Sequence, residues 1–320
     1  MKYAMMNQIL CAPPVKSGQS ARHPDGLIIL NKPKGPTSAA CLNRIKSRFE
    51  LKKVGHAGTL DPMATGILVV LVGQATKLAS YVTEGPKTYL GTILLGFSTD
   101  TYDMQGKILQ RKDCSEVSAQ QIVEEIKSWE NLSEQPVPPV SAAKHMGRPF
   151  HAIIRAGQKV PHKTKKINIY RTETILIDSA SVMFRITCSA GTYVRSLAHS
   201  LGIRLGCGAA LAELVREQSH PFALDQAVDL EELLESGDLE KHLLPISKAL
   251  SNWPQVTLNE IQERFIRNGR PVEADNPEDY LLRENDPVLL LSEHGTPVAL
   301  AEAKFRDGRL MWSIIRGLWA

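Results

Sequence analysis

The sequence predicts a mixed fold of helices and strands. Two patterns carry this prediction: apolar runs that are typical of buried or half-buried strands, and apolar residues repeated at helical spacing. The expected strands are residues 26–30, 67–72, 90–96 and 181–188. The expected helices begin at Thr37 or Ser38, at Gly73, at Val117 and at Val194. With 320 residues, the chain can form one large domain or two.

The bulk composition is that of an ordinary soluble globular enzyme, with 43% hydrophobic and 22% charged residues. The five cysteines are odd in number and contain no Cys-x-x-Cys pair, which disfavours a disulfide framework and a Cys-based zinc site. We therefore expect a reducing, cytoplasmic location. No apolar run approaches the ~20 residues of a membrane span. Nucleotide-binding and zinc motifs are also missing from the sequence, so neither a cofactor nor a metal is expected.

The charged residues are segregated along the chain, although the net charge is only +4. Residues 135–172 carry eight Lys or Arg and no acid, and residues 32–53 carry seven against one acid. By contrast, residues 225–240 carry seven acids and no Lys or Arg. Segregated positive charge indicates a polyphosphate partner. Either basic run taken singly is also compatible with a solvated surface face.

A glycine-rich loop lies at the centre of the predicted fold, at Gly55–Gly66. Three glycines and Pro62 in twelve residues argue against a helix or a central strand. The loop carries His56 and Asp61 and leads directly into an apolar strand. A carboxylate held in such a loop is typical of a functional site. On composition alone, the more common role for Asp61 would be to begin a turn before Pro62.

Read as a motif, the loop Gly-His-Ala-Gly-Thr-Leu-Asp-Pro-x-Ala-Thr-Gly resembles the catalytic loop of the bacterial tRNA pseudouridine-55 synthases of the TruB type. The resemblance implies that Asp61 is the catalytic residue. It also implies that Gly58 and Thr59 contribute to substrate binding. His56 would stack on the nucleotides or fill the space that a flipped base leaves, although a lone histidine is more often structural.

Two further motifs near the N-terminal half resemble the same family. Lys-Pro-x-Gly-x-Thr-Ser at Lys32–Ser38 implies that Lys32 steers phosphate or buttresses the catalytic loop; its alternative is a solvated turn lysine. Lys-x-Tyr at Lys87–Tyr89 implies that Tyr89 stacks on the target base, whereas an aromatic at a strand start is usually a core residue. The acids of the Thr-Asp-Thr-x-Asp run ending at Asp103 are expected to be turn and capping residues.

The C-terminal half of the resemblance adds a second set of site residues. Cys-x-x-Gly-Thr-Tyr-x-Arg-x-Leu implies that Arg195 pairs with Asp61, where a guanidinium would keep the carboxylate ionised and oriented. The run 206–222 implies that Leu214 lines the uracil pocket. The family often has two adjacent arginines there, but this chain reads Val215-Arg216, so phosphate contacts from this strand are in doubt. Phe150-His151 similarly replaces a tyrosine region of the family.

The resemblance implies an α+β protein with the pseudouridine-synthase fold: a mixed, largely antiparallel sheet with flanking helices and a catalytic cleft. We expect residues 1–24 to be a flexible extension and residues 25–250 to be the catalytic domain. Residues 251–320 are expected to form a small PUA-like, RNA-binding β-barrel. There, Thr257 and Glu260 predict a capping box for a helix with Leu258, Ile261 and Phe265 on one face and Gly269 as its end. Short strands are expected at residues 287–291, 297–301 and 310–314.

The activity implied is the isomerisation of uridine 55 in the tRNA T-loop to pseudouridine, through base flipping, glycosidic cleavage and rejoining at C5. The expected partner is the T-stem-loop of tRNA, bound by a monomer without an obligate protein partner. Whether Asp61 attacks C1′ or C6, or abstracts a ribose proton, stays open at this point. Two alternatives also stay open: a subunit of an RNA-guided pseudouridine synthase, and a tRNA-binding folding chaperone.

Overall fold

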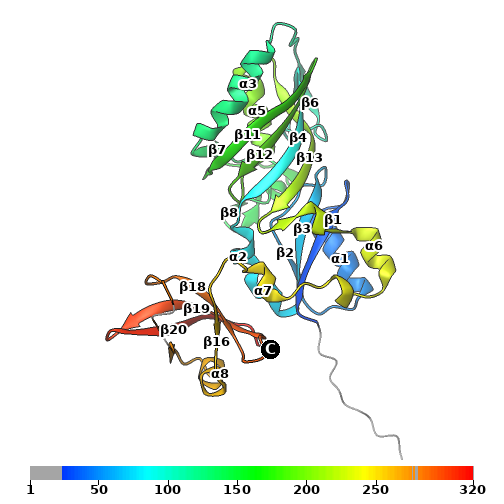
Figure 1. Ribbon diagram of the computed structural model, residues 1–320. Helices are drawn as coiled ribbons and strands as arrows, with labels where there is room; N and C mark the ends of the chain where they lie inside the picture. The colour runs from blue at the N-terminus through cyan, green and yellow to red at the C-terminus, as the bar shows by residue number, and fades with distance from the viewer. Residues whose placement is uncertain (1–23, 276, 278–279, 320) are drawn as a thin grey trace, which may run out of the picture.

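The computed structural model describes residues 24–275, 277 and 280–319 (Figure 1). The expected N-terminal extension, residues 1–24, therefore falls almost entirely outside the described residues. The molecule is elongated, with one large sheet running through its upper and middle parts and a smaller sheet at the lower end (Figure 1).

The large sheet has nine strands in the described residues, and six of its eight pairings are antiparallel. Its order is β11-β12-β4-β13-β3-β1-β15, with β2 paired to β3 and β14 to β13. The expectation of a mixed, largely antiparallel sheet is confirmed. The strands are β1 (Gly26–Lys32), β2 (Val54–Ala57), β3 (Thr65–Val72), β4 (Lys87–Leu95), β11 (Ile169–Asp178), β12 (Ser181–Cys188), β13 (Ala209–Ser219), β14 (Phe222–Ala223) and β15 (Val228–Asp229).

One of the two parallel pairings joins the halves of the sheet. β13 meets β3 through only two residue pairs, Val215 with Thr65 and Arg216 with Gly66. Gly66 is required there because its φ is +95° and a Cβ on it would lie 2.4 Å from the Arg216 carbonyl oxygen. The sheet is therefore held together at its centre by a short and sterically exacting contact.

Helices cover one face of this sheet and bury its main apolar core. That core takes residues from α1 (Ser38–Arg48), α3 (Ala119–Ser128), α5 (Val194–Arg204) and α6 (Leu230–Ser236). Thr37 caps α1 by accepting a hydrogen bond from the Ala40 amide, and a capping box of Ser118 and Gln121 opens α3. The predicted helix at Gly73 is a 3₁₀ turn, η1 (Gly73–Leu78), followed by α2 (Ala79–Thr83).

The opposite face of β1 and β3 is covered as well. Leu27 and Ile29 of β1 lie in a second apolar core together with Leu300 and Leu318 from the C-terminal end of the chain. The short helix α7 (Ile246–Ala249) also contributes to this core. Burial on both faces explains why these two strands are continuously apolar in sequence.

The C-terminal end forms a curled, five-stranded sheet of order β16-β18-β19-β20-β17, with its own core around Trp312. The strands are β16 (Gln255–Thr257), β17 (Val272–Glu273), β18 (Pro287–Leu291), β19 (Pro297–Arg306) and β20 (Arg309–Gly317). The three predicted strands are present, and two of them are longer than expected.

The helix of this unit, α8 (Glu260–Arg267), corrects two expectations. Its capping box is formed by Asn259 and Gln262, not by Thr257 and Glu260. Leu258 precedes the helix, and Ile261 is 69% exposed while Ile266 is buried, so the expected apolar face was wrong. Gly269, with φ +76°, follows the helix end as predicted.

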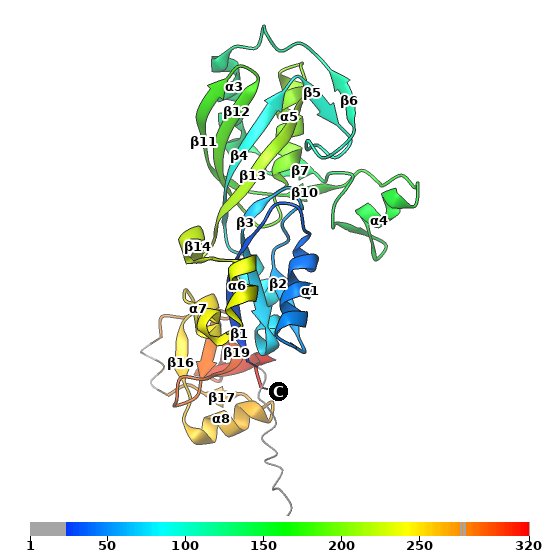
Figure 2. The ribbon, with the colours of Figure 1, turned by 90° about the vertical axis from the view of Figure 1, so that its right-hand side faces the viewer.

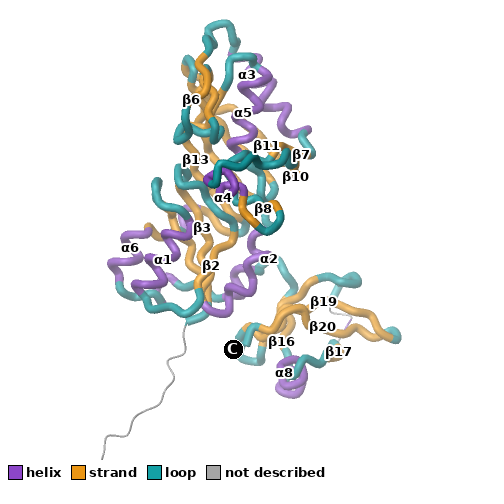
Figure 3. Tube along the Cα trace, turned by 180° about the vertical axis from the view of Figure 1, so that it is seen from behind, coloured by secondary structure: helices purple, strands orange, loops and turns teal. Residues whose placement is uncertain are grey.

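Between β7 (Glu134–Pro136) and β10 (Thr164–Lys166), which pair with each other, residues 137–163 leave the body of the molecule. We call this segment the basic arm. It contains β8 (Lys144–His145), β9 (Arg148–Pro149) and α4 (Phe150–Arg155). Figure 2 shows α4 standing out from the body, and Figure 3 places α4 and β8 at the height at which β13 meets β3. A further hairpin joins β5 (Phe97–Thr99) to β6 (Ile108–Arg111).

Candidate active site

A cavity of about 340 Å³ lies beside the junction of β13 and β3, within the size range of small-ligand pockets. It is lined by the loop after β2, by β4, by β13, by the start of α5 and by the base of the basic arm. Seven of the predicted site residues line it: His56, Gly58, Thr59, Asp61, Tyr89, Arg195 and Leu214.

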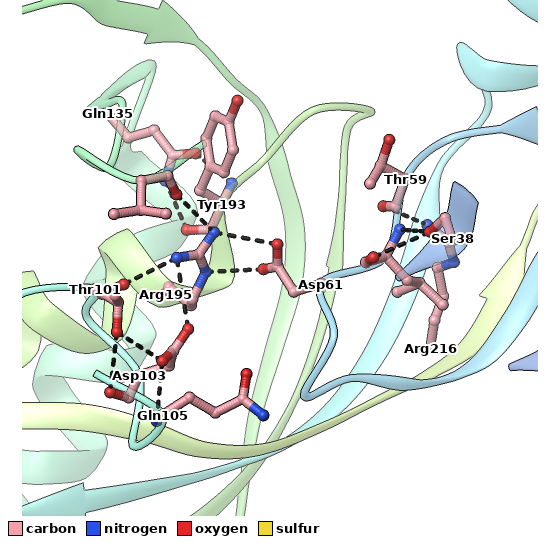
Figure 4. A network of polar contacts seen from close by, with 12 residues as sticks. Ser38, Thr59, Asp61, Thr101, Asp103, Gln105, Gln135, Tyr193, Arg195 and Arg216 are labelled. Atoms are coloured by element: carbon pink, nitrogen blue, oxygen red, sulfur yellow. Dashed lines mark hydrogen bonds and ion pairs between the residues drawn. The ribbon is translucent and has the colours of Figure 1, made fainter. Parts of the chain in front are cut away.

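The loop that carries Asp61 is fixed through its main-chain carbonyl groups. Arg216 donates to the carbonyls of Gly58 and Thr59, and the Ser38 hydroxyl donates to that of Leu60. The Leu60 amide in turn donates to the Ser38 hydroxyl at 3.0 Å. The loop is therefore anchored at the three residues that precede Asp61, and the Asp61 side chain lines the cavity (Figure 4).

The pairing of Arg195 with Asp61 is present. Arg195 Nε lies 2.8 Å from Asp61 Oδ2 and Nη2 lies 3.1 Å from Oδ1, which is a bidentate arrangement (Figure 4). Arg195 is buried, whereas the Asp61 side chain is 35% exposed toward the cavity. The pair therefore holds the carboxylate in one orientation while leaving it accessible.

The remaining contacts of Arg195 include a residue that the sequence prediction assigned differently. Its Nη1 donates to the Thr101 carbonyl and lies 3.5 Å from Asp103 Oδ2, and its Nη2 donates to the Val140 carbonyl. Asp103 does accept turn hydrogen bonds from Thr101 and Gln105, as expected for its motif. It is also a buried second carboxylate for Arg195, a role that local turn chemistry did not reveal.

Two apolar walls of the cavity come from neighbouring strands. Tyr89 on β4 and Leu214 on β13 both line it and are both largely buried. Burial raises the pKa of the Tyr89 hydroxyl, so this ring stays neutral. Tyr89 is therefore both a core residue and part of the cavity wall, and its stacking on the target base stays a prediction.

Lys32 is not among the residues that line the cavity, unlike the other predicted site residues. It is fully buried, and its Nζ donates to the carbonyls of Pro33 and Pro36 at 2.8 Å and to that of Pro62 at 3.5 Å. The alternative of a solvated turn lysine was wrong. Burial lowers its pKa. Because Pro62 follows Asp61, the contacts of Lys32 match the expected buttress of the loop.

Two buried cations that the sequence prediction did not assign to the site also line the cavity, Lys87 and Arg216. Lys87 Nζ donates to the carbonyls of Thr83 and Gly85. Burial, followed by the positive charge of Arg216, lowers the pKa of Lys87 to about 8. The Lys-x-Tyr motif contained Lys87, but sequence alone gave no reason to place its ammonium group in the cavity wall.

His56 lies on β2, not in a strandless loop as expected, because this short edge strand pairs with β3 and tolerates Gly55. Its ring lines the cavity, and its Nδ1 is buried without a hydrogen-bond partner among the described residues. Burial and the nearby charge of Arg216 lower its pKa, which favours the neutral imidazole at pH 7.

Two family models match this chain. Residues 46–194 match the family model described as "TruB family pseudouridylate synthase (N terminal domain)", and residues 195–251 match "tRNA pseudouridylate synthase B C-terminal domain". The chain is 48% identical over 298 residues to the tRNA pseudouridine synthase B of Oleidesulfovibrio alaskensis (strain ATCC BAA-1058 / DSM 17464 / G20), covering 92% of this chain and 96% of that protein. The chain belongs to the TruB family.

A second relative and a solved structure are also similar to this chain. The tRNA pseudouridine synthase B of Geobacter sulfurreducens (strain ATCC 51573 / DSM 12127 / PCA) is 40% identical over 250 residues, covering 77% of this chain and 82% of that protein. Among solved structures, a Cbf5-Nop10-Gar1 complex contains a chain with a TM-score of 0.69 and 25% identity. That match covers 92% of this chain and 85% of the other, and it confirms the expected pseudouridine-synthase fold.

The basic arm of this TruB-family chain flanks the cavity. Ser141 and Ala142, at its base, are part of the cavity lining. The eight Lys and Arg side chains of residues 135–172 are all exposed, whereas Phe150, within the arm, is buried. In the described part of the chain, no group of three or more His, Cys, Asp or Glu could hold a metal ion. None of the described helices is long and apolar enough to span a membrane.

Proposed function

We propose that this chain converts uridine 55 in the T-loop of tRNA into pseudouridine. The observation that carries the proposal is the bidentate Arg195–Asp61 pair at the wall of an otherwise cation-rich cavity in a TruB-family fold. Relatives at 40–48% identity, named tRNA pseudouridine synthase B, support the substrate. The reaction breaks the N1–C1′ bond and forms a C5–C1′ bond, while C5 loses a proton and N1 gains one.

The substrate base must leave its stack to reach this cavity, which costs a few kcal/mol. Tyr89 and Leu214 would enclose the flipped uracil between β4 and β13, because both side chains line the cavity. His56, at the edge of the same cavity, would stack on neighbouring nucleotides or take the place of the flipped base. Gly58 and Thr59 offer main-chain contact at the loop.

Asp61 would then act on the bound nucleotide. Its carboxylate is oriented by Arg195 and exposed to the cavity, which suits a nucleophile or a base acting on one face of the nucleotide. Attack at C1′, attack at C6 and removal of a ribose proton each require this same carboxylate, so the proposal does not depend on which is used.

We also propose a division of labour along the chain. Residues 25–250 would form the catalytic domain, and residues 251–320 a PUA-like module that contacts RNA. The exposed cations of the basic arm would bind tRNA phosphates beside the cavity. The enzyme would act as a monomer in the cytoplasm, without cofactor, metal or obligate protein partner.

The deciding experiment is pseudouridine mapping on an unmodified tRNA transcript, incubated with the purified wild type or Asp61→Ala and no other component. Product at position 55 from the wild type alone would support substrate, autonomy and catalytic residue together. Product only after a guide ribonucleoprotein is added would favour the RNA-guided alternative, and tRNA refolding without product would favour the chaperone. Product from both proteins would mean that Asp61 is not the catalytic residue.

The role of the basic arm has its own test. Binding of tRNA to Asp61→Ala, measured across a salt series, should weaken steeply as salt rises, because each neutralised phosphate releases counterions. Affinity that is insensitive to salt would contradict the arm as a phosphate-binding surface.

A further inference from the structure

We propose that Arg216 is a positioning residue for catalysis, because it fixes both ends of the loop that carries Asp61. This inference rests on the proposed function only for its kinetic consequences. The loop leaves β2 after Ala57, which pairs with Val69, and enters β3 at Thr65. Arg216 lies on β13, at the pairing with Gly66.

The hydrogen bonds of Arg216 reach across the loop. Its Nε donates to the Ile67 carbonyl at 2.6 Å, on the strand that follows the loop. Its Nη2 donates to the Gly58 carbonyl at 3.0 Å, and its Nη1 approaches the Thr59 carbonyl at 3.5 Å, both on the segment that precedes Asp61. One rigid, planar group therefore sets the distance between the two ends.

The environment of Arg216 supports a role in positioning the loop and not a role in binding phosphate. The residue is only 1% exposed, and its hydrogen bonds to the loop go to main-chain carbonyls. Contact with Gly66 is also tight, since a Cβ there would come within 2.4 Å of the Arg216 carbonyl oxygen. The backbone of Arg216 thus fixes β3, and its side chain fixes the loop.

A lysine could not replace this arrangement. Its ammonium is a single point of charge on a flexible stem, whereas the guanidinium presents donors in a fixed fork. In Arg216→Lys, we expect the charge near the cavity to persist and the carbonyl groups of Gly58 and Ile67 to lose their shared anchor. The two substitutions, Arg216→Lys and Arg216→Ala, therefore separate geometry from charge.

The first measurement is amide hydrogen exchange, which needs no RNA. Residues 58–67 should exchange faster in Arg216→Lys and Arg216→Ala than in the wild type, while the β11–β12 pair stays protected. Arg185→Ala is the matched control, because Arg185 on β12 makes a half-exposed ion pair with Glu217 outside the cavity lining. Unchanged exchange in residues 58–67 would overturn the proposal even if the enzyme proved to act on another RNA.

The second measurement is single-turnover conversion of tRNA at saturating enzyme. We expect both Arg216 variants to lose about 10²-fold in rate, the cost of a ~1 Å misplacement of a catalytic group, with tRNA affinity unchanged. Added guanidinium should restore part of the rate in Arg216→Ala. It should restore none in Arg216→Lys, because the lysine side chain still fills the space of the guanidinium group. Weaker tRNA binding at an unchanged rate would overturn the proposal in favour of substrate contact. Failure of both variants to fold would also overturn it, because Arg216 would then be a purely structural residue.

Discussion

Arg195 and Asp61 lie 134 residues apart in the chain and meet through two hydrogen bonds of 2.8 and 3.1 Å. The arginine is supplied by the first turn of α5 and the aspartate by the loop between β2 and β3. Arg195 is itself held by the Thr101 and Val140 carbonyls and by Asp103. The orientation of the Asp61 carboxylate therefore depends on three separate segments of the chain.

Replacing Asp61 by the isosteric asparagine should remove activity and spare binding. The amide fills the same volume next to Arg195 but carries no negative charge and is a poor nucleophile or base. We expect Asp61→Asn to lower single-turnover conversion of tRNA by at least about 10³-fold. Filter binding should show tRNA affinity close to that of the wild type, and a rate within tenfold of the wild type would contradict the assignment.

Arg195→Lys should reduce the rate although it preserves the charge. Lysine cannot form the two parallel hydrogen bonds to Asp61, so the carboxylate would lose its fixed orientation. We expect a loss of about 10²-fold in kcat, from misorientation. Arg204→Lys, later in the same helix and paired with Glu125 at the surface, is the control and should retain full activity. A change confined to KM would show that Arg195 serves binding.

Asp103→Asn tests the second carboxylate. The amide oxygen can still accept the turn hydrogen bonds from Thr101 and Gln105, but the charge facing Arg195 is lost. We expect kcat to fall by about tenfold or more, because Arg195 then loses one of the groups that orient it. Asp100→Asn is the matched control, since Asp100 is an exposed turn residue of the same motif. Equal activity of both variants would leave Asp103 as a turn residue alone.

The lowered pKa of Lys87 predicts that the free energy of unfolding depends on pH. Its pKa in the folded protein is about 8, below the ordinary value of 10.5, so the unfolded chain binds the extra proton between these two values. Stability contributed by this position therefore rises as pH increases from about 8 toward 10.5 and is lost as pH falls through about 8. The full effect is about 3 kcal/mol. Urea unfolding of the wild type and Lys87→Met at pH 7.5 and 9.5 should show their difference shifting in favour of the wild type at the higher pH. A constant difference would contradict the low pKa.

The C-terminal unit should unfold together with the rest. Leu300 lies in the core that it shares with β1 and β3. We expect Leu300→Ala to cost about 2–5 kcal/mol and to lower the melting temperature of the whole chain in one transition. Leu281→Ala, at a fully exposed leucine of the same unit, should change little. Two separate transitions in calorimetry would show that the units unfold independently.

The sequence was most informative where a motif encodes a local feature. The strand at 181–188 is present, as its local alternation predicts. The pairing of Arg195 with Asp61 is also present, but it was implied by the family motif and not by any local pattern. It was least informative for long side chains that act at a distance. Arg216 contacts carbonyls 149 and 158 residues away, and nothing in its own neighbourhood indicates that reach.

The other differences between the predictions and the structure arise where a short sequence pattern fits two local structures. Thr257-x-x-Glu260 and Asn259-x-x-Gln262 both fit a capping box, and only the parallel pairing of β16 with β18 decides between them, because it keeps Thr257 in a strand. Lys32 was ambiguous for a similar reason. A lysine beside two prolines is usually solvated, but Lys32 is buried and contacts the Pro62 carbonyl of the loop that carries Asp61.

The buried cations also bear on how this protein would respond to selection for heat resistance. Lys32, Lys87, Arg195 and Arg216 are each at most 5% exposed, and the carboxylates that pair with Arg195 are those of Asp61 and Asp103. Lys32, Lys87 and Arg216 instead rest on main-chain carbonyls. Apolar side chains in their places would often make a fold more stable. A thermostability screen run without an activity assay should therefore recover apolar substitutions at these two lysines early.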